Sequence, residues 1–380
     1  MKTILFISAG IESIPGIKLA NEMGYHTVAT DKNKNAPGFQ FSNDKIIAST
    51  YDIKETLAEV IKYHKNNKSI NGVISIAADV PMTVSSVAEK LGLACNSLST
   101  SILSSDKIKM KEVFKNNKVP TPEFRQINSY KEFINICNNW SFPLIIKPSD
   151  SRGARGVLQI NEKVDLKWAY DHSLSYSSSK KLIVEKYILG PQISTESIIY
   201  NGTCTTVGFS DRNYEYLEKY FPHIIENGGD LPASLSKSQE IEINNIIKNA
   251  AHSLGVERGV VKGDIVISNG EPIIIEMATR LSGGYFCSHE IPLSTGVDFV
   301  GNAIKIAMGE NINIKDLYPK FSKNICQRYI FPKEGKIKKI NGLELLKQKK
   351  DIEFFKMFIK NNDIIKNYTS HISRAGVIIA

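Results

Sequence analysis

The first hundred residues alternate short apolar runs with segments whose apolar residues recur at helical spacing. The runs that predict strands are Thr3–Ser8, His26–Thr30 and Gly72–Ile76. The segments that predict helices are Ile14–Met23, Thr56–Tyr63 and Val80–Leu91. Strands that alternate with helices are typical of a parallel, doubly wound sheet. The pattern therefore predicts a Rossmann-like α/β domain at residues 1–104.

After residue 104 the pattern changes to hairpins and longer strands. The prolines of Val119–Pro122 mark a boundary, and the amphipathic segment Ser238–Leu254 predicts a helix. We expect three further units, at residues 105–190, 191–315 and 316–380, and the last of them is a small α+β segment. Its final residues, Ala375–Ala380, have the composition of a strand. They indicate either an edge strand or a trimmed C-terminus.

Composition and charge exclude several classes of function. The net charge is +9, but the lysines are spread along the chain and form no basic cluster interleaved with aromatic residues, so we expect no nucleic-acid partner. No apolar run reaches the roughly 18 residues of a membrane span, and the short N-terminal run soon meets Glu12, which argues against a signal peptide. The five cysteines are far apart and show no zinc spacing. We expect reduced, packed thiols in a cytoplasmic protein.

The strongest chemical signal lies in residues 262–284. Asp264 and Glu276 sit on two strand-like runs joined by a short turn, and Arg280 and the glycine pair Gly283–Gly284 follow at once. Mg²⁺ prefers carboxylate and phosphate oxygens, and arginine binds phosphate or carboxylate oxygens in a two-pronged manner. The segment therefore predicts a site for Mg²⁺ and a nucleoside triphosphate. The alternative is a surface hairpin that carries two unrelated acids.

The length of the turn decides between these alternatives. Side chains alternate along a strand, so a two-residue Asn269–Gly270 loop would pair Asp264 with Ile275 and turn Glu276 to the other face. A three-residue loop, Ser268–Gly270, would place both acids on one face. The metal site therefore requires the three-residue loop, with Gly270 in the left-handed conformation.

Other segments have the character of nucleotide-binding elements. Lys147 ends a strand and precedes a small, glycine-bearing loop, Ser149–Gly156, whose N–H groups can surround an anion. The alternative is a flexible cationic hairpin. Lys107 lies at the start of a helix, where a surface lysine is the ordinary interpretation. Glu185–Ile188 ends a strand before a turn and could offer adenine one backbone donor and one acceptor.

We expect no dinucleotide site in the first domain, because Ser8–Ser13 contains Gly10 but lacks the second and third glycines of the GxGxxG pattern. Asp31 and Asp79 follow predicted strands, and ligands of open α/β sheets bind at the carboxyl ends of strands. Either residue could contact a substrate. For Asp79 the alternative is the N-cap of the helix Val80–Leu91.

Taken in chain order, these elements resemble the ATP-grasp superfamily over essentially the whole chain. The elements are Lys107, Lys147 with its glycine loop, Glu185–Ile188, Asp264, Glu276 and Arg280. The N-terminal unit with Asp31 is similar to the pre-ATP-grasp domain of the biotin carboxylase and carbamoyl-phosphate synthase branch. The resemblance implies a Rossmann-like pre-ATP-grasp domain, a two-lobed ATP-grasp fold and a small C-terminal α+β segment.

The resemblance also implies roles for individual residues. Lys107 and Lys147 would hold the α and β phosphates of ATP, and Ser149, Gly153 and Gly156 would belong to a mobile lid over the β and γ phosphates. Asp264 and Glu276 would bind one or two Mg²⁺ ions, for which Mn²⁺ is expected to substitute, and Arg280 would act with Lys147 in catalysis. The expected adenine and ribose contacts are Glu185, Lys186, Tyr187, Ile188, Gln192 and Glu196. The expected substrate contacts are Ser282, Gly283, Gly284, His289, Asp31 and Asp79.

The reaction implied by the resemblance is the ATP-dependent joining of a carboxylate to an amine through an acyl phosphate, on an amino acid or a surface-sugar precursor, by a possible homodimer. One alternative is a carbamoyl-phosphate-synthase-like kinase of bicarbonate or carbamate, and another is a non-catalytic nucleotide-binding protein. The sequence departs from the family pattern at Ala278, where an asparagine often serves as a third metal ligand, at Gln192 and at Ala154.

Overall fold

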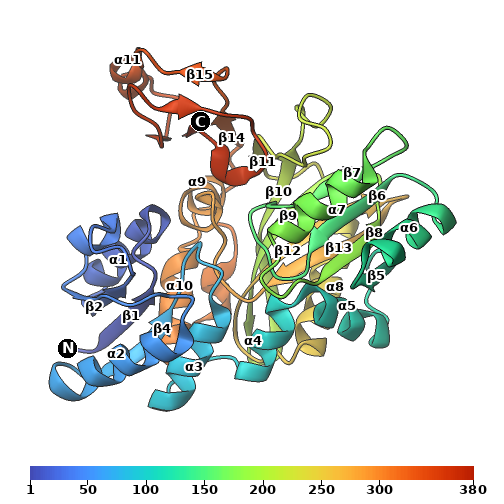
Figure 1. Cartoon of the computed structure of the whole chain (residues 1–380). Helices are drawn as coiled ribbons and strands as arrows, with labels where there is room; N and C mark the ends of the chain where they lie inside the picture. The colour runs from blue at the N-terminus through green and yellow to red at the C-terminus, as the bar shows by residue number, and fades with distance from the viewer.

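The computed structural model describes residues 1–380 (Figure 1). The N-terminal part is a parallel sheet with the strand order β3-β2-β1-β4. Its strands are β1 (Thr3–Ile7), β2 (His26–Thr30), β3 (Asp44–Ile46) and β4 (Ile70–Ile74). The helices between and after them are α1 (Ile14–Glu22), α2 (Ile53–Asn66) and α3 (Pro81–Leu91). The predicted Rossmann-like α/β class is confirmed.

A small antiparallel sheet follows, with the order β5-β8-β6-β7. Its strands are β5 (Phe124–Ile127), β6 (Leu144–Pro148), β7 (Leu158–Ile160) and β8 (Leu182–Lys186). Helices α6 (Tyr130–Asn139) and α7 (Leu166–Ser175) supply Phe133 and Tyr170 to the apolar cluster on this sheet. Strands β6 and β7 pair antiparallel, so the glycine-bearing segment between them is a hairpin loop as predicted.

The largest sheet has eight strands in the order β13-β12-β9-β10-β11-β14-β18-β16. Its strands are β9 (Gln192–Tyr200), β10 (Thr203–Asn213), β11 (Gly228–Leu231), β12 (Gly259–Ser268), β13 (Glu271–Ala278), β14 (Ile325–Ile330), β16 (Phe354–Met357) and β18 (Gly376–Ile379). Strands from the C-terminal segment thus extend this sheet. Strand β18 lies between β14 and β16, so the expected edge strand is an interior strand, because both of its sides form hydrogen bonds.

The remaining elements connect these sheets or cover them. The helices are α4 (Leu98–Ser105), α5 (Lys107–Asn116), α8 (Lys237–Ser253), α9 (Ile291–Thr295), α10 (Phe299–Ala307) and α11 (Leu343–Lys347). Strands β15 (Gly335–Lys336) and β17 (Ile364–Ile365) form a two-stranded ribbon in the arm that projects at the top of Figure 1. The boundaries at residues 104, 190 and 315 stay predictions.

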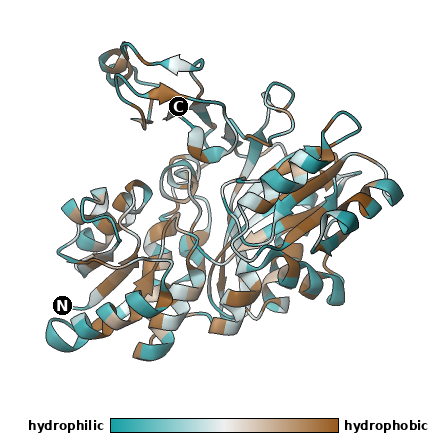
Figure 2. Cartoon of the chain, viewed as in Figure 1, coloured by the Kyte–Doolittle hydropathy of each residue, from teal (hydrophilic) through white to brown (hydrophobic).

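The largest apolar cluster joins the N-terminal sheet to the eight-stranded sheet. This cluster contains Ile4 and Phe6 of β1, Ile198 of β9, Leu281 after β13, and Ile304 of α10. All five side chains are fully or almost fully buried. The brown strands in the interior of Figure 2 show the same concentration of apolar residues. Burial of this kind contributes roughly 25 cal/mol for each Å² of apolar surface removed from water. The cluster therefore fixes the carboxyl ends of β1 and β4 against the segment that follows β13.

The cysteines and the helices bear on two expectations from composition, namely packed thiols and no membrane span. The five cysteines are free, and three of them, Cys137, Cys204 and Cys287, are buried as expected. Cys326 is exposed, so the expectation of a packed thiol is wrong there, because its side chain alternates outward on β14. None of the helices combines the length and apolar character that crossing a bilayer requires.

Candidate active site

A cavity of about 680 Å³ lies where the N-terminal sheet, the small sheet, the eight-stranded sheet and the C-terminal segment meet. Its wall is rich in charge. The acids that line it are Glu12, Asp79, Glu185, Glu226, Asp264, Glu276 and Glu290, and the lysines and arginines are Lys107, Lys147, Arg152, Arg155, Lys186, Arg212, Lys262, Arg280 and Arg374. A wall with more cations than anions suits a polyanionic ligand.

The hairpin of β12 and β13 places Asp264 directly opposite Glu276. The connection is a two-residue turn, since Ser268 pairs with Glu271, and Asn269 and Gly270 have φ values of 51° and 87°. The predicted three-residue loop is therefore wrong. A β-bulge between Asp264 and Ile265 leaves Ile275 unpaired and shifts the register by one residue. The bulge, rather than the turn, brings both carboxylates to one face.

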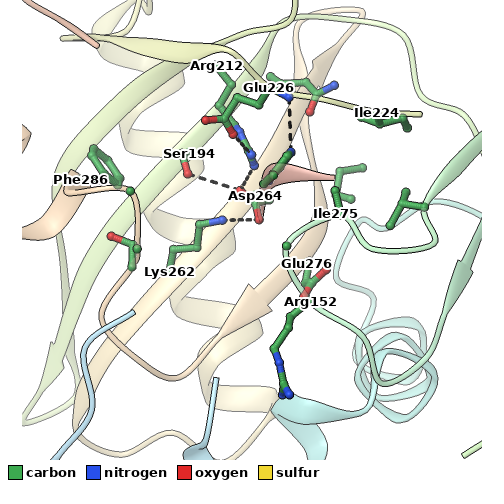
Figure 3. Close-up of a pocket in the computed structure, with 18 of the residues that line it drawn as sticks. Arg152, Ser194, Arg212, Ile224, Glu226, Lys262, Asp264, Ile275, Glu276 and Phe286 are labelled. Atoms are coloured by element: carbon green, nitrogen blue, oxygen red, sulfur yellow. Dashed lines mark hydrogen bonds and ion pairs between the residues drawn. The ribbon is translucent and has the colours of Figure 1, made fainter. Parts of the chain in front are cut away.

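Asp264 is the centre of a cluster of polar contacts (Figure 3). Its Oδ1 lies 2.5 Å from Arg212 Nη1 and accepts a hydrogen bond from Ser194 Oγ at 3.3 Å, while Lys262 Nζ contacts Oδ2. Burial raises the pKa of Asp264, but the charges of Lys262 and Arg212 outweigh it and hold the pKa far below the usual range. The carboxylate is therefore ionised throughout the neutral range.

Glu276 faces the lysine at the start of α5. Lys107 Nζ lies 3.0 Å from Glu276 Oε1 and donates to the carbonyl of Ser151 at 2.8 Å. The ordinary surface interpretation of Lys107 is wrong, because the side chain is buried under the loop after β6. Burial lowers the pKa of Lys107, but the charges of Glu276 and Asp79 outweigh it and keep the ammonium protonated.

Lys147 and Glu185 form a buried ion pair that also includes Lys111. Glu185 Oε1 lies 2.9 Å from Lys147 Nζ and 3.3 Å from Lys111 Nζ. Burial lowers the pKa of Lys111 to about 8, against the opposing charge of Glu185. Glu185 does line the cavity, but its carboxylate neutralises two lysines. Its direct physical role is therefore to position Lys147, and Lys111 is a residue that the sequence interpretation missed.

The segment expected to hold adenine lines the cavity, with Lys186, Tyr187, Ile188 and Gln192 all on its wall. The N–H groups of Lys186 and Tyr187 already donate to the carbonyls of Glu123 and Pro143, at 3.0 and 3.2 Å. The N–H of Ile188 has no acceptor within the protein. It is the donor in this segment that can serve a ligand.

Some residues of the glycine-bearing loop line the cavity, and others support the base of the loop. Gly153 lines the cavity, as do Arg152 and Arg155. Ser149 and Gly156 lie at the base of the loop, outside the wall, so the structure does not support them as ATP contacts. Ser149 is buried, and its carbonyl accepts the N–H of Lys107 at 3.1 Å. At Gly156, where φ is +70°, an added Cβ would lie 3.0 Å from Pro148, so both the backbone conformation and the close packing favour glycine.

The side of the cavity that is expected to hold the substrate contains Arg280 and the residues after it. Arg280 Nε lies 3.6 Å from Asp79 Oδ1, and both residues line the cavity. Asp79 does not cap a helix, because α3 begins at Pro81 and Val80 is the N-cap residue without a side-chain bond. Ser282, Gly283 and Gly284 also line the cavity, as expected.

Three expected site residues lie elsewhere. Glu196 is fully buried and does not line the cavity. It accepts the N–H of Ser282 at 2.9 Å, and burial raises its pKa to about 7. His289 packs against the rings of Tyr285 and Phe354, with centroids 5.2 and 4.3 Å away. Asp31 turns back to accept the N–H of Asn33 at 2.9 Å.

Several wall residues were missed by the sequence interpretation. Lys262 stands two residues before Asp264, so strand alternation alone places both side chains on one face, and this signal could have found it. Glu12 lies in the first turn after β1, the usual ligand-binding edge of a parallel sheet. Arg374 comes from the C-terminal segment, donates to the carbonyl of Glu226 at 2.7 Å and has no local sequence signal.

The donor set fits Mg²⁺ in combination with phosphate. No group of three or more His, Cys, Asp or Glu residues could hold a metal ion by itself. Asp264 and Glu276 offer two hard carboxylates on one face of the cavity. Mg²⁺ is commonly held by one or two carboxylates together with substrate phosphates and water, rather than by a complete protein cage. Ala278, opposite Lys262, adds no third ligand.

The chain is similar to known ligases. Residues 104–284 match the family model of the ATP-grasp domain. The D-alanine–D-alanine ligase of Azoarcus sp. (strain BH72) is 25% identical over 237 residues, which are 60% of this chain and 76% of that protein. The uncharacterized protein y4rH of Sinorhizobium fredii is 22% identical over 343 residues, which are 89% of this chain and 70% of that protein.

A solved structure agrees with this assignment. The L-amino acid ligase from Bacillus licheniformis superposes with a TM-score of 0.83 and 19% identity, over 100% of this chain and 93% of that chain. At this identity the likeness shows the fold. Residues 104–284 therefore form an ATP-grasp domain, and the fold of the chain is similar to that of the L-amino acid ligase.

Proposed function

We propose that the protein joins a carboxylate to an amine at the expense of ATP, through an acyl phosphate, with release of ADP and phosphate. One observation carries the proposal: Asp264 and Glu276 face one cavity that Lys107, Lys147 and Arg280 also line. The arrangement supplies hard oxygen ligands and cations around a single space. The names of the similar D-alanine–D-alanine and L-amino acid ligases favour an amino acid as the carboxylate.

The roles of the residues follow from their charges. Mg²⁺ held by Asp264 and Glu276 would neutralise phosphate charge and make the γ-phosphorus accessible to a carboxylate. Lys107 and Lys147 supply ammonium groups for the phosphate oxygens, and Glu185 fixes the position of Lys147 through their 2.9 Å contact. Arg280 reaches the cavity beside Asp79 and stabilises negative charge on the transferring phosphoryl group and on the acyl oxygen.

The second half of the reaction needs a site without water. The amine nitrogen forms a bond to the acyl carbon, the bond from that carbon to the phosphate oxygen breaks, and the amine loses a proton. The loop after β6 excludes water from this step by covering the phosphates. Backbone at Gly283 and Gly284 allows the acyl group to approach closely, and Glu12 accepts the N–H of Gly284 at 2.8 Å, which fixes this turn.

Further parts of the proposal concern conditions and assembly. We propose that Mn²⁺ substitutes for Mg²⁺, since both accept carboxylate and phosphate oxygens. We also propose a cytoplasmic homodimer, and an organisation with limits at residues 104, 190 and 315. Sedimentation equilibrium of the purified chain measures the assembly directly.

The test is a phosphate-release screen with ATP and Mg²⁺, in which amino acids and sugar acids are combined with a panel of amines. We expect phosphate release that requires both a carboxylate and an amine, together with a product whose mass equals their sum less one water. ADP formation with bicarbonate alone would favour the carbamoyl-phosphate-synthase-like alternative. An absence of ATP turnover with every pair would favour the non-catalytic nucleotide-binding protein.

A further inference from the structure

The glycine-bearing loop between β6 and β7 has a fixed base and a tip that crosses to other parts of the chain. At the base, Asp150 accepts hydrogen bonds from Ser177 Oγ at 3.0 Å and from the N–H of Ser179 at 2.7 Å. Ser173 Oγ donates to the carbonyl of Gly156 at 2.8 Å. These partners belong to the same lobe as the loop. They hold its two ends, and Lys107 Nζ also holds the carbonyl of Ser151 at 2.8 Å, so the tip consists of residues 152–155.

The tip is held by residues far away in the sequence. The Arg152 guanidinium lies over the ring of Tyr51, 3.9 Å from the ring centroid, and Arg152 Nη1 donates to the carbonyl of Asp79 at 3.3 Å. On the other side, the N–H of His371 donates to the carbonyl of Gly153 at 3.2 Å. The loop tip therefore spans the cavity between the N-terminal domain and the C-terminal segment.

Tyr51 is the one aromatic side chain in these contacts of the loop tip. It is 55% exposed, it lines the cavity, and its hydroxyl makes no hydrogen bond with the protein. A single exposed aromatic side chain is ordinary on a surface, so the Arg152 guanidinium stacked on the ring is what sets Tyr51 apart. An arginine stacked on an aromatic face is a favourable contact that depends on the ring and not on the hydroxyl.

We propose that Tyr51 is a positioning residue that latches the loop tip over the cavity by stacking on Arg152. It acts through Arg152 and touches no reacting atom.

The chemical consequence of losing this contact rests on the proposed function. With the tip raised, the oxygen of water attacks the acyl carbon of the acyl phosphate, the bond to the phosphate oxygen breaks, and the free carboxylate returns. The net reaction of that failure is ATP and water to ADP, phosphate and a proton.

The first test measures the loop itself and needs no turnover. Trypsin cleaves after Arg152 and Arg155 only when the tip leaves the cavity, and the fragments are followed by mass spectrometry. Tyr51→Leu should cleave about three- to tenfold faster than the natural chain, the change that loss of one cation–π contact implies. Tyr51→Phe, which keeps the ring, should cleave at the natural rate.

A matched control separates the latch from a general effect of removing a surface tyrosine. Tyr318 is 56% exposed and does not line the cavity, so Tyr318→Leu should leave the cleavage rate unchanged. Arg152→Lys keeps the tryptic site but loses the planar stack, and it should cleave faster as well. Equal rates for Tyr51→Leu and the natural chain, or equally fast cleavage of Tyr51→Phe, would overturn the latch.

The second test measures coupling. Once a substrate pair is known, Tyr51→Leu should raise the ratio of phosphate released to product formed by about three- to tenfold, and Tyr51→Phe should restore the natural ratio. An unchanged ratio alongside faster tryptic cleavage would refute the role in water exclusion. Faster cleavage in a chain that turns over no ATP would uphold the latch and reject the proposed ligase.

Discussion

Replacement of Glu276 by glutamine is expected to lower kcat by at least about 100-fold while the protein stays folded. Asp264 is flanked by Arg212 and Lys262, so Glu276 carries a large share of the negative charge that attracts a dication. Glutamine keeps an oxygen that can accept from Lys107, 3.0 Å away, and the side chain is 33% exposed. The loss should therefore appear in the rate and in the Mg²⁺ concentration needed, measured by steady-state kinetics at several Mg²⁺ concentrations.

Glu271→Gln is the matched control for this variant. Glu271 begins the same strand, β13, but is exposed at the hairpin turn and does not line the cavity. Its replacement should leave kcat and the Mg²⁺ dependence unchanged, and both variants should unfold at the temperature of the natural chain. Full activity of the Glu276→Gln variant would show that Glu276 is not a metal ligand.

Replacement of Glu185 by glutamine is expected to cost about 3–5 kcal/mol of unfolding free energy, because it leaves two buried ammonium groups without a carboxylate. Lys111 and Lys147 lie 3.3 and 2.9 Å from Glu185, and all three side chains are almost fully buried. Burial already lowers the pKa of Lys111 to about 8 in the presence of that carboxylate. Urea unfolding of both chains at neutral pH measures the difference.

The pH dependence of this loss has a defined sign. In the unfolded variant, lysines keep their protons up to about pH 10.4, whereas burial lowers the pKa of Lys111 in the folded state, so that Lys111 releases its proton earlier. The unfolded state then binds more protons, so the stability of Glu185→Gln should rise as the pH increases from 7 towards 10. A deficit that is constant over this range would contradict the burial argument.

A surface ion pair in the same lobe provides the comparison. Lys186 and Glu123 lie 2.9 Å apart with side chains that are 47% and 46% exposed. Glu123→Gln should cost no more than about 1 kcal/mol, the ordinary value of an exposed pair. Equal losses for Glu123→Gln and Glu185→Gln would show that Glu185 has no special structural role.

Much of the fold could be predicted because local patterns decide it. Alternation of apolar runs and helical periodicity sufficed for the N-terminal sheet, and Asp106 caps α5 at the position where the pattern begins that helix. The place of β18 could not be predicted, because strand order depends on pairings between residues about 50 positions apart, such as Arg328 with Ile378. Local sequence carries no record of such pairings.

The site shows the same division. Asp264 and Glu276 could be predicted from their spacing. Their position on one face depends on a β-bulge at Ile275, and the sequence of this strand contains no signal that predicts a bulge. Glu196 was expected near the ribose, but an acid on a strand can face either side of the sheet. In the structure its carboxylate is buried and accepts the N–H of Ser282. Arg374 could not be found, since it is the pairing of β18 with β14 that brings the C-terminal segment to the cavity.

The central claim is that the carboxylates opposite each other on β12 and β13 bind Mg²⁺ together with ATP. Isothermal titration of a non-hydrolysable ATP analogue, with and without Mg²⁺, measures this binding in the natural chain and in the double variant Asp264→Asn/Glu276→Gln. We expect Mg²⁺ to strengthen binding to the natural chain by at least about tenfold and to have no such effect on the double variant. Equal affinity with and without Mg²⁺ in the natural chain, or a Mg²⁺ effect that survives in the double variant, would contradict the claim.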